Sequence, residues 1–181
     1  MLINPKTSCF ILIDVQEKLI KLIAGYEELI KRIAWLLTLA NELKQPVIVS
    51  EQYRKGLLAT VAELQPLIEN VPLFDKVAFS CGQDDKIIDY LKSQPYKQVI
   101  LFGIESHVCV LQTAMDLKQQ GYDVFVVADA ISARDTDSTK LAIKRMRQAG
   151  IEIVNCEMVF FELVQKAGTE EFKKLSKKFL I

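Results

Sequence analysis

Cys109 occupies a position in the sequence where a thiol can become a nucleophile. The apolar run Val99–Phe102, bounded by Gly103, predicts a strand buried on both faces, and a helix from His107 to Gln120 is predicted almost directly after it. If Ser106 is the N-cap of that helix, Cys109 lies in its first turn. Unpaired backbone N–H groups and the helix dipole would favour the thiolate there. A packing role for a small buried thiol fits the position equally well.

Asp14 and Lys76 could assist such a nucleophile. Asp14 lies near the end of the apolar run Ser8–Val15, and Lys76 lies within Pro72–Ser80, where a short strand is predicted. In a parallel sheet, ligands bind beyond the carboxyl ends of the strands. A carboxylate, an ammonium and a thiol that converge there would supply a base, a positive charge and a nucleophile. Taken singly, Asp14 could be a helix cap and Lys76 could extend into solvent.

His107 is the one histidine of the chain and the obvious rival to Asp14 as a base for the thiol. It lies two residues before Cys109 on the predicted helix, and side chains at that spacing diverge, so direct pairing is not expected. One histidine makes a multi-histidine metal site impossible, and the cysteines form no CxxC pair. We therefore expect no metal and no cofactor.

Strands alternate with helices along the chain, which predicts an α/β fold with a parallel sheet and helices on both faces. The predicted strands are Ser8–Val15, Pro46–Ser50, Pro72–Ser80, Val99–Phe102, Asp123–Ala128 and Ile151–Asn155. The predicted helices are Gln16–Leu43, Asp84–Leu91, His107–Gln120, Ser138–Ala149, Met158–Val164 and Thr169–Phe179. The smaller predicted features are a loop at Gln52–Gly56, a helical turn at Thr60–Leu64, a break at Gly25 and a helix cap at Asp137. Asp129 and Arg134 follow the fifth predicted strand.

The composition narrows the class of protein. With 181 residues, 50% of them hydrophobic, the chain predicts one domain over residues 1–181. Lys and Arg together number 23, as do Asp and Glu, and the first basic cluster is Lys173–Lys178 near the end. This balance argues against a nucleic-acid or anionic-membrane partner.

The first residues and the cysteines indicate a compartment. The opening MLINPKTSCF lacks the cationic segment and apolar core of a secretory signal, and no apolar run reaches the length that spans a membrane. The four cysteines, Cys9, Cys81, Cys109 and Cys156, are scattered and fit free thiols in a reducing compartment. We expect a cytoplasmic protein.

Motifs along almost the whole chain resemble one known family. They are IDVQ at Ile13–Gln16, EQYRKGL at Glu51–Leu57, FDKVAFS at Phe74–Ser80, LFGIESHVCVLQTAMDL at Leu101–Leu117 and VVADAISAR at Val126–Arg134. Together they resemble the isochorismatase-like hydrolases, the cysteine-hydrolase superfamily that includes nicotinamidases and N-carbamoylsarcosine amidase. The chain looks most similar to the isochorismatase domain-containing proteins, in which EQY.KGL and FGIE.HVC recur together.

The resemblance implies a three-layer αβα sandwich around a six-stranded parallel sheet, with a catalytic triad of Asp14, Lys76 and Cys109. It also implies a cis peptide bond between Ile104 and Glu105. Departures from the family narrow the chemistry. Nicotinamidases carry an Asp and two His metal ligands after the second strand, where this chain has QYRK, and true isochorismatases lack the nucleophilic cysteine. A metal-independent amidohydrolase is therefore favoured.

The expected reaction is hydrolysis of a small amide or related compound through a thioester on Cys109, with an oxyanion bound by the N–H of Val108 or Cys109. Candidates to line the substrate pocket are Gln16, Gln52, Tyr53, Glu105 and His107, each of which could instead be structural. The resemblance also implies a homo-oligomer, a dimer or larger. The competing classes are a non-catalytic binding or scaffold protein that retained the fold, and a redox sensor with Cys81 or Cys156 as resolving thiol.

Overall fold

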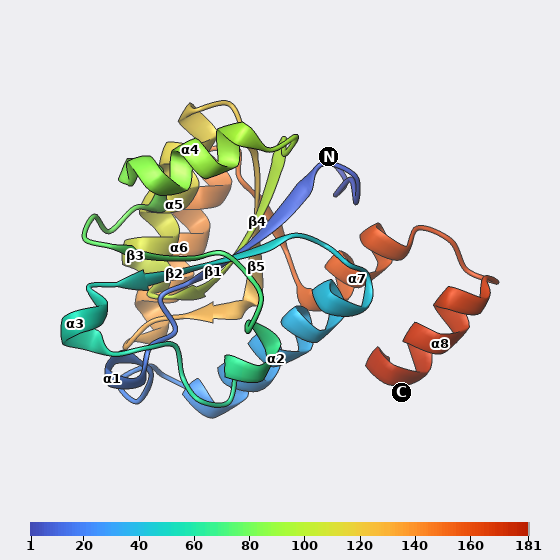
Figure 1. The fold of residues 1–181 in the computed structure, drawn as a ribbon, viewed down its shortest axis with the longest axis horizontal. Coiled ribbons are helices and arrows are strands. Elements are labelled where there is room, and N and C mark those ends of the chain that lie inside the picture. Colours follow the sequence, from blue (N-terminus) through green and yellow to red (C-terminus); the bar gives the residue numbers. More distant parts are fainter. Residues whose placement is uncertain (181) are drawn as a thin grey trace.

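A computed structural model of the chain describes residues 1–180, and its centre is a parallel sheet of six strands (Figure 1). The strands are β1 (Ser8–Ile13), β2 (Val47–Gln52), β3 (Leu73–Lys76), β4 (Gln98–Ile104), β5 (Asp123–Ser132) and β6 (Glu152–Val154). Their order is β3-β2-β1-β4-β5-β6, and every pairing is parallel. The chain winds outward from β1 to β3 and then from β4 to β6, so the order reverses between β1 and β4. Ligands of such sheets bind at the carboxyl end of that switch point.

Helices cover both faces of this sheet (Figure 1). On one face lie α2 (Tyr26–Glu42), α7 (Cys156–Val164) and α8 (Glu170–Phe179), and on the other lie α4 (Asp85–Ser93), α5 (Leu111–Gln119) and α6 (Thr136–Gln148). Short helical pieces fill the connections: α1 (Glu17–Ile20), α3 (Arg54–Leu57), two 3₁₀ turns at Gln65–Leu67 and Cys81–Gln83, and a π-helix at Ser106–Val110. The expected αβα sandwich with a six-stranded parallel sheet is confirmed.

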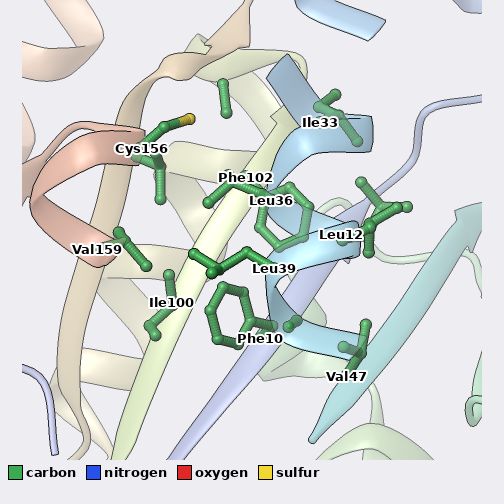
Figure 2. Packing of buried hydrophobic residues seen from close by; sticks show 14 of the residues in the cluster. Phe10, Leu12, Ile33, Leu36, Leu39, Val47, Ile100, Phe102, Cys156 and Val159 are labelled. Carbon is green, nitrogen blue, oxygen red and sulfur yellow. The ribbon is translucent and has the colours of Figure 1, made fainter. Parts of the chain in front are cut away.

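The strand residues alternate between two hydrophobic layers, as a strand buried on both faces requires. On β1, Phe10 and Leu12 pack into the layer beneath α2 and α7, whereas Ile11 and Ile13 pack into the layer beneath α4 and α5. Figure 2 shows the first layer, where Phe10, Leu12, Ile100 and Phe102 meet Ile33, Leu36 and Leu39 of α2. The packing of these apolar side chains stabilises the sheet. The polar candidate residues lie at the ends of the strands.

Gly103 allows β1 and β4 to approach closely at that edge. Its φ of 122° lies outside the range that other residues adopt easily, and a Cβ at this position would collide with the carbonyl group of Ile13. The residue after Ile13 is Asp14, and the π-helix with Cys109 begins shortly after Gly103. The close approach therefore brings the ends of two distant segments together.

The long first helix is interrupted as the sequence predicted. Gly25 has a φ of 66° and is the N-cap of α2, and α1 forms a separate short helix before it. The predicted loop at Gln52–Gly56 was wrong in part, because α3 begins within it at Arg54.

Two further local predictions differ from the structure in detail. At Thr60–Leu64 the predicted helical turn is a hydrogen-bonded turn that precedes the 3₁₀ turn Gln65–Leu67, with the Leu64 N–H donating to the Val61 carbonyl at 3.0 Å. The cap of α6 is Asp135 rather than Asp137, because the Asp135 carboxylate accepts from the N–H groups of Asp137 and Ser138.

Candidate active site

Asp14 and Lys76 meet at the carboxyl edge of the sheet, where β2 separates their strands β1 and β3. Asp14 directly follows β1 with a φ of 54°, and Lys76 is the last residue of β3. The Lys76 Nζ lies 2.8 Å from Asp14 Oδ2, and the two side chains are 0% and 1% exposed. A lone lysine was expected to reach solvent, but its partners keep this one inside. A buried ion pair of this kind persists only when the remaining hydrogen bonds of both groups are made.

Those hydrogen bonds are made for Lys76. Besides Asp14, its ammonium donates to Gln52 Oε1 at 2.6 Å and to the carbonyl groups of Ala78 and Phe79 at 3.1 and 2.9 Å. Burial alone would lower the pKa of Lys76, but the Asp14 carboxylate and the nearby thiols raise it, and the net direction is upward. Lys76 is therefore a fixed positive charge.

Ser50 holds the other oxygen of the Asp14 carboxylate. The Ser50 hydroxyl donates to Asp14 Oδ1 at 2.7 Å, and the Asp14 N–H donates to the Ser50 carbonyl at 3.0 Å. Sequence reasoning missed Ser50, which it placed only as the end of a strand. No local sequence signal marks Ser50, because only the register of β1 and β2, which pairs Ser50 with Ile13, places it beside Asp14.

Cys109 completes the cluster from the π-helix Ser106–Val110. Cys109 is 7% exposed, and its thiol is close enough to Asp14 and Lys76 for both charges to shift its pKa. Burial raises the pKa of this thiol, the Asp14 carboxylate raises it further, and the Lys76 ammonium opposes both. The expectation that the helix dipole favours a resting thiolate is wrong, because desolvation and the adjacent carboxylate outweigh it.

The expected N-cap was also wrong. Glu105 takes that position, and the hydroxyl of Ser106 instead shares a 2.9 Å hydrogen bond with Thr139 of α6. The peptide bond between Ile104 and Glu105 is cis. The Val108 N–H, one of the expected oxyanion donors, donates to the Glu105 carbonyl at 3.1 Å.

Gln16 and Gln52 lie in the cluster but serve its structure. The side-chain amide of Gln16 bonds the backbone N–H and carbonyl of Gln52 at 2.7 and 3.0 Å, and the carbonyl of Leu58 at 2.7 Å. Gln52 Oε1 accepts from the Lys76 ammonium at 2.6 Å, and Gln52 Nε2 donates to the Val77 carbonyl at 2.6 Å. Tyr53 is exposed and contributes its backbone N–H to the Lys76 carbonyl at 2.8 Å. These contacts fix Lys76 in place.

The side chains of the remaining candidates have other partners or surroundings. The Glu105 carboxylate pairs with Arg134, whose Nε donates at 3.0 Å. His107 lines a cavity of about 170 Å³ against α6, and its Nδ1 is buried without a hydrogen-bond partner among residues 1–180. Asp129 lies within β5, not beyond it, and accepts the N–H of Cys156 at 2.9 Å.

Cys81 is a second thiol close to the ion pair. It is fully buried, burial raises its pKa to about 11, and the charges of Asp14 and Lys76 act on it in opposite directions. Its thiol interacts with Ser50 and Thr113. Cys81 belongs to the same buried cluster as Cys109, and its backbone N–H donates to the Thr113 hydroxyl at 2.9 Å.

Within residues 1–180, no group of three or more His, Cys, Asp and Glu side chains is arranged to hold a metal ion. No helix in the same range is long and apolar enough to cross a membrane.

Comparisons with known proteins agree on one family. The sequence model of the Isochorismatase domain matches residues 8–158. The chain is 38% identical over 177 residues to the secreted isochorismatase effector Isc1 of Phytophthora sojae, a match that covers 96% of this chain and 84% of that protein.

Solved structures agree with the sequence comparison. A structure described as the MAR1 ribonuclease of Caenorhabditis elegans superposes with a TM-score of 0.92 at 40% identity, covering 100% of this chain and 93% of that one. The YcaC gene product of Escherichia coli, described as an octameric hydrolase of unknown specificity, superposes with a TM-score of 0.86 at 24% identity, covering 91% and 83%. The second likeness shows the fold alone.

Proposed function

The chain belongs to the isochorismatase family, a family of hydrolases, and we propose that it is a cysteine-dependent hydrolase that cleaves the C–N bond of a small amide or related compound. The observation that supports this most is the buried Asp14–Lys76 ion pair with the Cys109 thiol beside it. The site residues we assign are Asp14, Lys76 and Cys109. The unit that carries them is one domain over residues 1–181.

In the first half of the proposed reaction, Asp14 takes the proton of the Cys109 thiol as the sulfur attacks the substrate carbonyl carbon. A C–S bond forms, and the carbonyl oxygen becomes an oxyanion. When the oxyanion collapses, the C–N bond breaks and the leaving amine takes the proton from Asp14. The products of this half are a free amine and a thioester on Cys109.

In the second half, water attacks the thioester and gives its proton to Asp14. The C–S bond then breaks, the sulfur takes the proton back, and a carboxylic acid leaves. Asp14 and Cys109 return to their starting states, so the cycle needs no cofactor.

The raised pKa of Cys109 supports a base-assisted attack rather than a standing thiolate. Because burial and Asp14 keep the sulfur protonated at neutral pH, the thiol needs a nearby base. Asp14 is that base. Lys76 remains charged through the cycle, and its ammonium stabilises whichever neighbour carries the negative charge.

The backbone N–H of Cys109 is the better oxyanion donor of the two that the sequence suggested. The N–H of Val108 is already donated to the Glu105 carbonyl at 3.1 Å. A donor must be free to meet the developing charge, so we assign this role to Cys109.

The test is a screen of small amides, ureido compounds and esters with the wild type and with Cys109→Ala. We expect hydrolysis of at least one amide or ureido compound by the wild type and none above background by Cys109→Ala. Cys156→Ala, a second buried cysteine outside the cluster, is the matched control and should keep the activity. Equal rates for the wild type and Cys109→Ala would remove the proposal and favour the scaffold alternative.

Nuclease activity, which the description of the C. elegans relative suggests for that protein, has less support here. This chain has a formal net charge of zero, and its one histidine faces α6 instead of the ion pair. Nuclease substrates are polyanions that bind to basic surfaces. A small uncharged substrate fits the cluster better.

Assembly and location also belong to the proposal. We propose a homo-oligomer, which the octameric description of the E. coli relative supports for the fold. A cytoplasmic location stays a prediction, and the P. sojae relative is described as secreted.

A further inference from the structure

A cavity of about 220 Å³ lies at the carboxyl edge of the sheet between the segment after Asp14 and the segment before Cys109. Its lining residues are Leu19, Leu22, Ile23, Glu105 and Arg134. The three aliphatic side chains come from α1 and the turn after it, whereas Glu105 and Arg134 follow β4 and β5. The strands β1, β4 and β5 are neighbours, so their carboxyl ends bring these segments together.

Both proposed reacting residues are tied to the walls of this cavity. The segment with Leu19 begins directly after Asp14, and the N–H of Gln16 donates to the Asp14 carbonyl at 2.9 Å. The carbonyl of Glu105 accepts from the N–H of Val110 at 3.2 Å, so Glu105 forms the turn next to Cys109. The walls of the cavity therefore belong to the same two chain segments that carry Asp14 and Cys109.

The walls are also held in place. The turn between α1 and α2 is fixed to the end of β5 by two hydrogen bonds of 2.9 Å, from the Ala24 N–H to the Ala133 carbonyl and from the Ser132 hydroxyl to the Ala24 carbonyl. A preformed pocket of this kind binds its ligand without a large ordering cost.

The chemistry of the walls favours an uncharged apolar group. Leu19, Leu22 and Ile23 present hydrocarbon, and the charges of Glu105 and Arg134 are already paired at 3.0 Å. The reacting cluster is likewise neutral in sum, since the Asp14 carboxylate is paired with Lys76 and the Cys109 thiol is protonated. Neither region calls for a charged substrate.

We infer that this cavity receives the acyl chain of the substrate, and that the preferred substrates are uncharged aliphatic amides. The inference rests on the proposed hydrolase function. An apolar cavity of about 150 Å³ holds a benzene molecule, so a cavity of about 220 Å³ holds an acyl chain of about six carbons.

The test uses primary amides from propanamide to heptanamide. In the wild type, kcat/KM should rise by about two- to fourfold with each methylene until the cavity is full, fourfold being the change that about 0.8 kcal/mol per buried methylene gives. Leu22→Asp places a charge on the apolar wall and should flatten this dependence. Leu141→Asp is the matched control on α6, because Leu141 is 61% exposed and Leu22 is 59% exposed, and it should keep the wild-type dependence.

Binding of the same amides to Cys109→Ala, measured by calorimetry, separates the two claims. If the wild type hydrolyses no amide but binding to Cys109→Ala tightens with chain length and Leu22→Asp removes that trend, the proposed function fails and the cavity assignment stands. If amides are hydrolysed without a chain-length trend, or if Leu22→Asp and Leu141→Asp behave alike, the cavity assignment is overturned.

Discussion

Cys109 and Cys156 lie in similar local settings in two regions of the molecule. Each is buried near the start of a helical segment beside an aspartate, Asp14 for Cys109 and Asp129 for Cys156. Burial raises the pKa of both thiols, and the neighbouring carboxylate raises each further. The two sites therefore share three features: a buried thiol, a neighbouring aspartate and a position near the start of a helical segment.

The partners of the two aspartates differ. Asp14 receives the fully buried ammonium of Lys76 and the hydroxyl of Ser50. Asp129 accepts the backbone N–H of Cys156, the first residue of α7, at 2.9 Å, and Asn155 is the N-cap of that helix. Arg32, the cation near Cys156, lowers the pKa of that thiol through its charge. A cysteine beside an aspartate is therefore not enough, because the acid must be held by groups that leave it able to take the proton.

Replacing the two aspartates should give the largest difference between the regions, because only the loss of Asp14 should lower kcat/KM. Asp14→Asn removes the proposed base, and kcat/KM should fall by about 10² to 10⁴-fold, the range that general acid–base catalysis contributes. Asp129→Ala removes the acceptor of the Cys156 N–H, so the free energy of unfolding should fall by about 1 kcal/mol with kcat/KM unchanged. Steady-state kinetics and urea unfolding of both variants check this. Equal losses of activity in the two variants would contradict the assignment.

Replacing Lys76, the cation near Cys109, should lower the free energy of unfolding much more than replacing Arg32, the cation near Cys156. Lys76→Met leaves the Asp14 charge buried and unpaired, and the free energy of unfolding should fall by about 3 to 5 kcal/mol. Arg32→Met should cost less than about 1 kcal/mol, as is usual for exposed ionic contacts. Urea unfolding at neutral pH measures both. A Lys76→Met protein as stable as the wild type would show that the ion pair is not the support we describe.

Ser50→Ala tests the support of the carboxylate from its other side. Hydrogen bonds to a charged group contribute about 1.5 to 3 kcal/mol, and we expect a loss of that size, shared between the free energy of unfolding and the activation free energy. Ser176→Ala on α8 removes an exposed hydroxyl that donates to the Lys173 carbonyl at 3.3 Å, and it should change both quantities by less than about 0.5 kcal/mol. If the two serine variants behave alike, Ser50 does not position Asp14.

Alkaline pH should reveal what the two thiols share. An unfolded thiol loses its proton near pH 9.0, whereas the folded Cys109 and Cys156 keep theirs to higher pH. The unfolded state then binds fewer protons, so stability is intact below pH 9 and falls as the pH rises above it. Each thiol should contribute a slope of about 1.4 kcal/mol per pH unit. Cys109→Ala and Cys156→Ala should each reduce the slope equally, and a change in only one of them would show that burial differs between the sites.

The sequence predicted the fold well because hydrophobic periodicity and turn residues are local signals. The alternation of strands and helices, the break at Gly25 and the strand end at Asp14 all follow from residues close in sequence. One error arose where a side chain from elsewhere in the chain binds a predicted cap residue. Thr139 shares a hydrogen bond with the hydroxyl of Ser106, which therefore does not cap its helix.

The sequence suggested Asp14, Lys76 and Cys109 as candidates, but it did not suggest which residues hold Asp14 and Lys76 in place with hydrogen bonds. Asp14, Lys76 and Cys109 are unusual residue types at strand ends and in a family motif, so the sequence singles them out. Ser50 is an ordinary strand residue until the register places it beside Asp14. Gln52 stays a predicted substrate contact, and the sequence did not show that it also accepts from Lys76. The pKa of Cys109 was predicted in the wrong direction, because desolvation depends on tertiary packing that a helix-start pattern does not contain.

The most direct measurement of the central claim is the intact mass of the protein during turnover of an acyl substrate, quenched in acid and mapped by peptide digestion. The account predicts an added mass equal to the acyl group, located on Cys109 in the wild type and in Cys156→Ala, and absent from Cys109→Ala. Turnover without any adduct on Cys109, or an adduct on Cys156 that persists in Cys109→Ala, would contradict it.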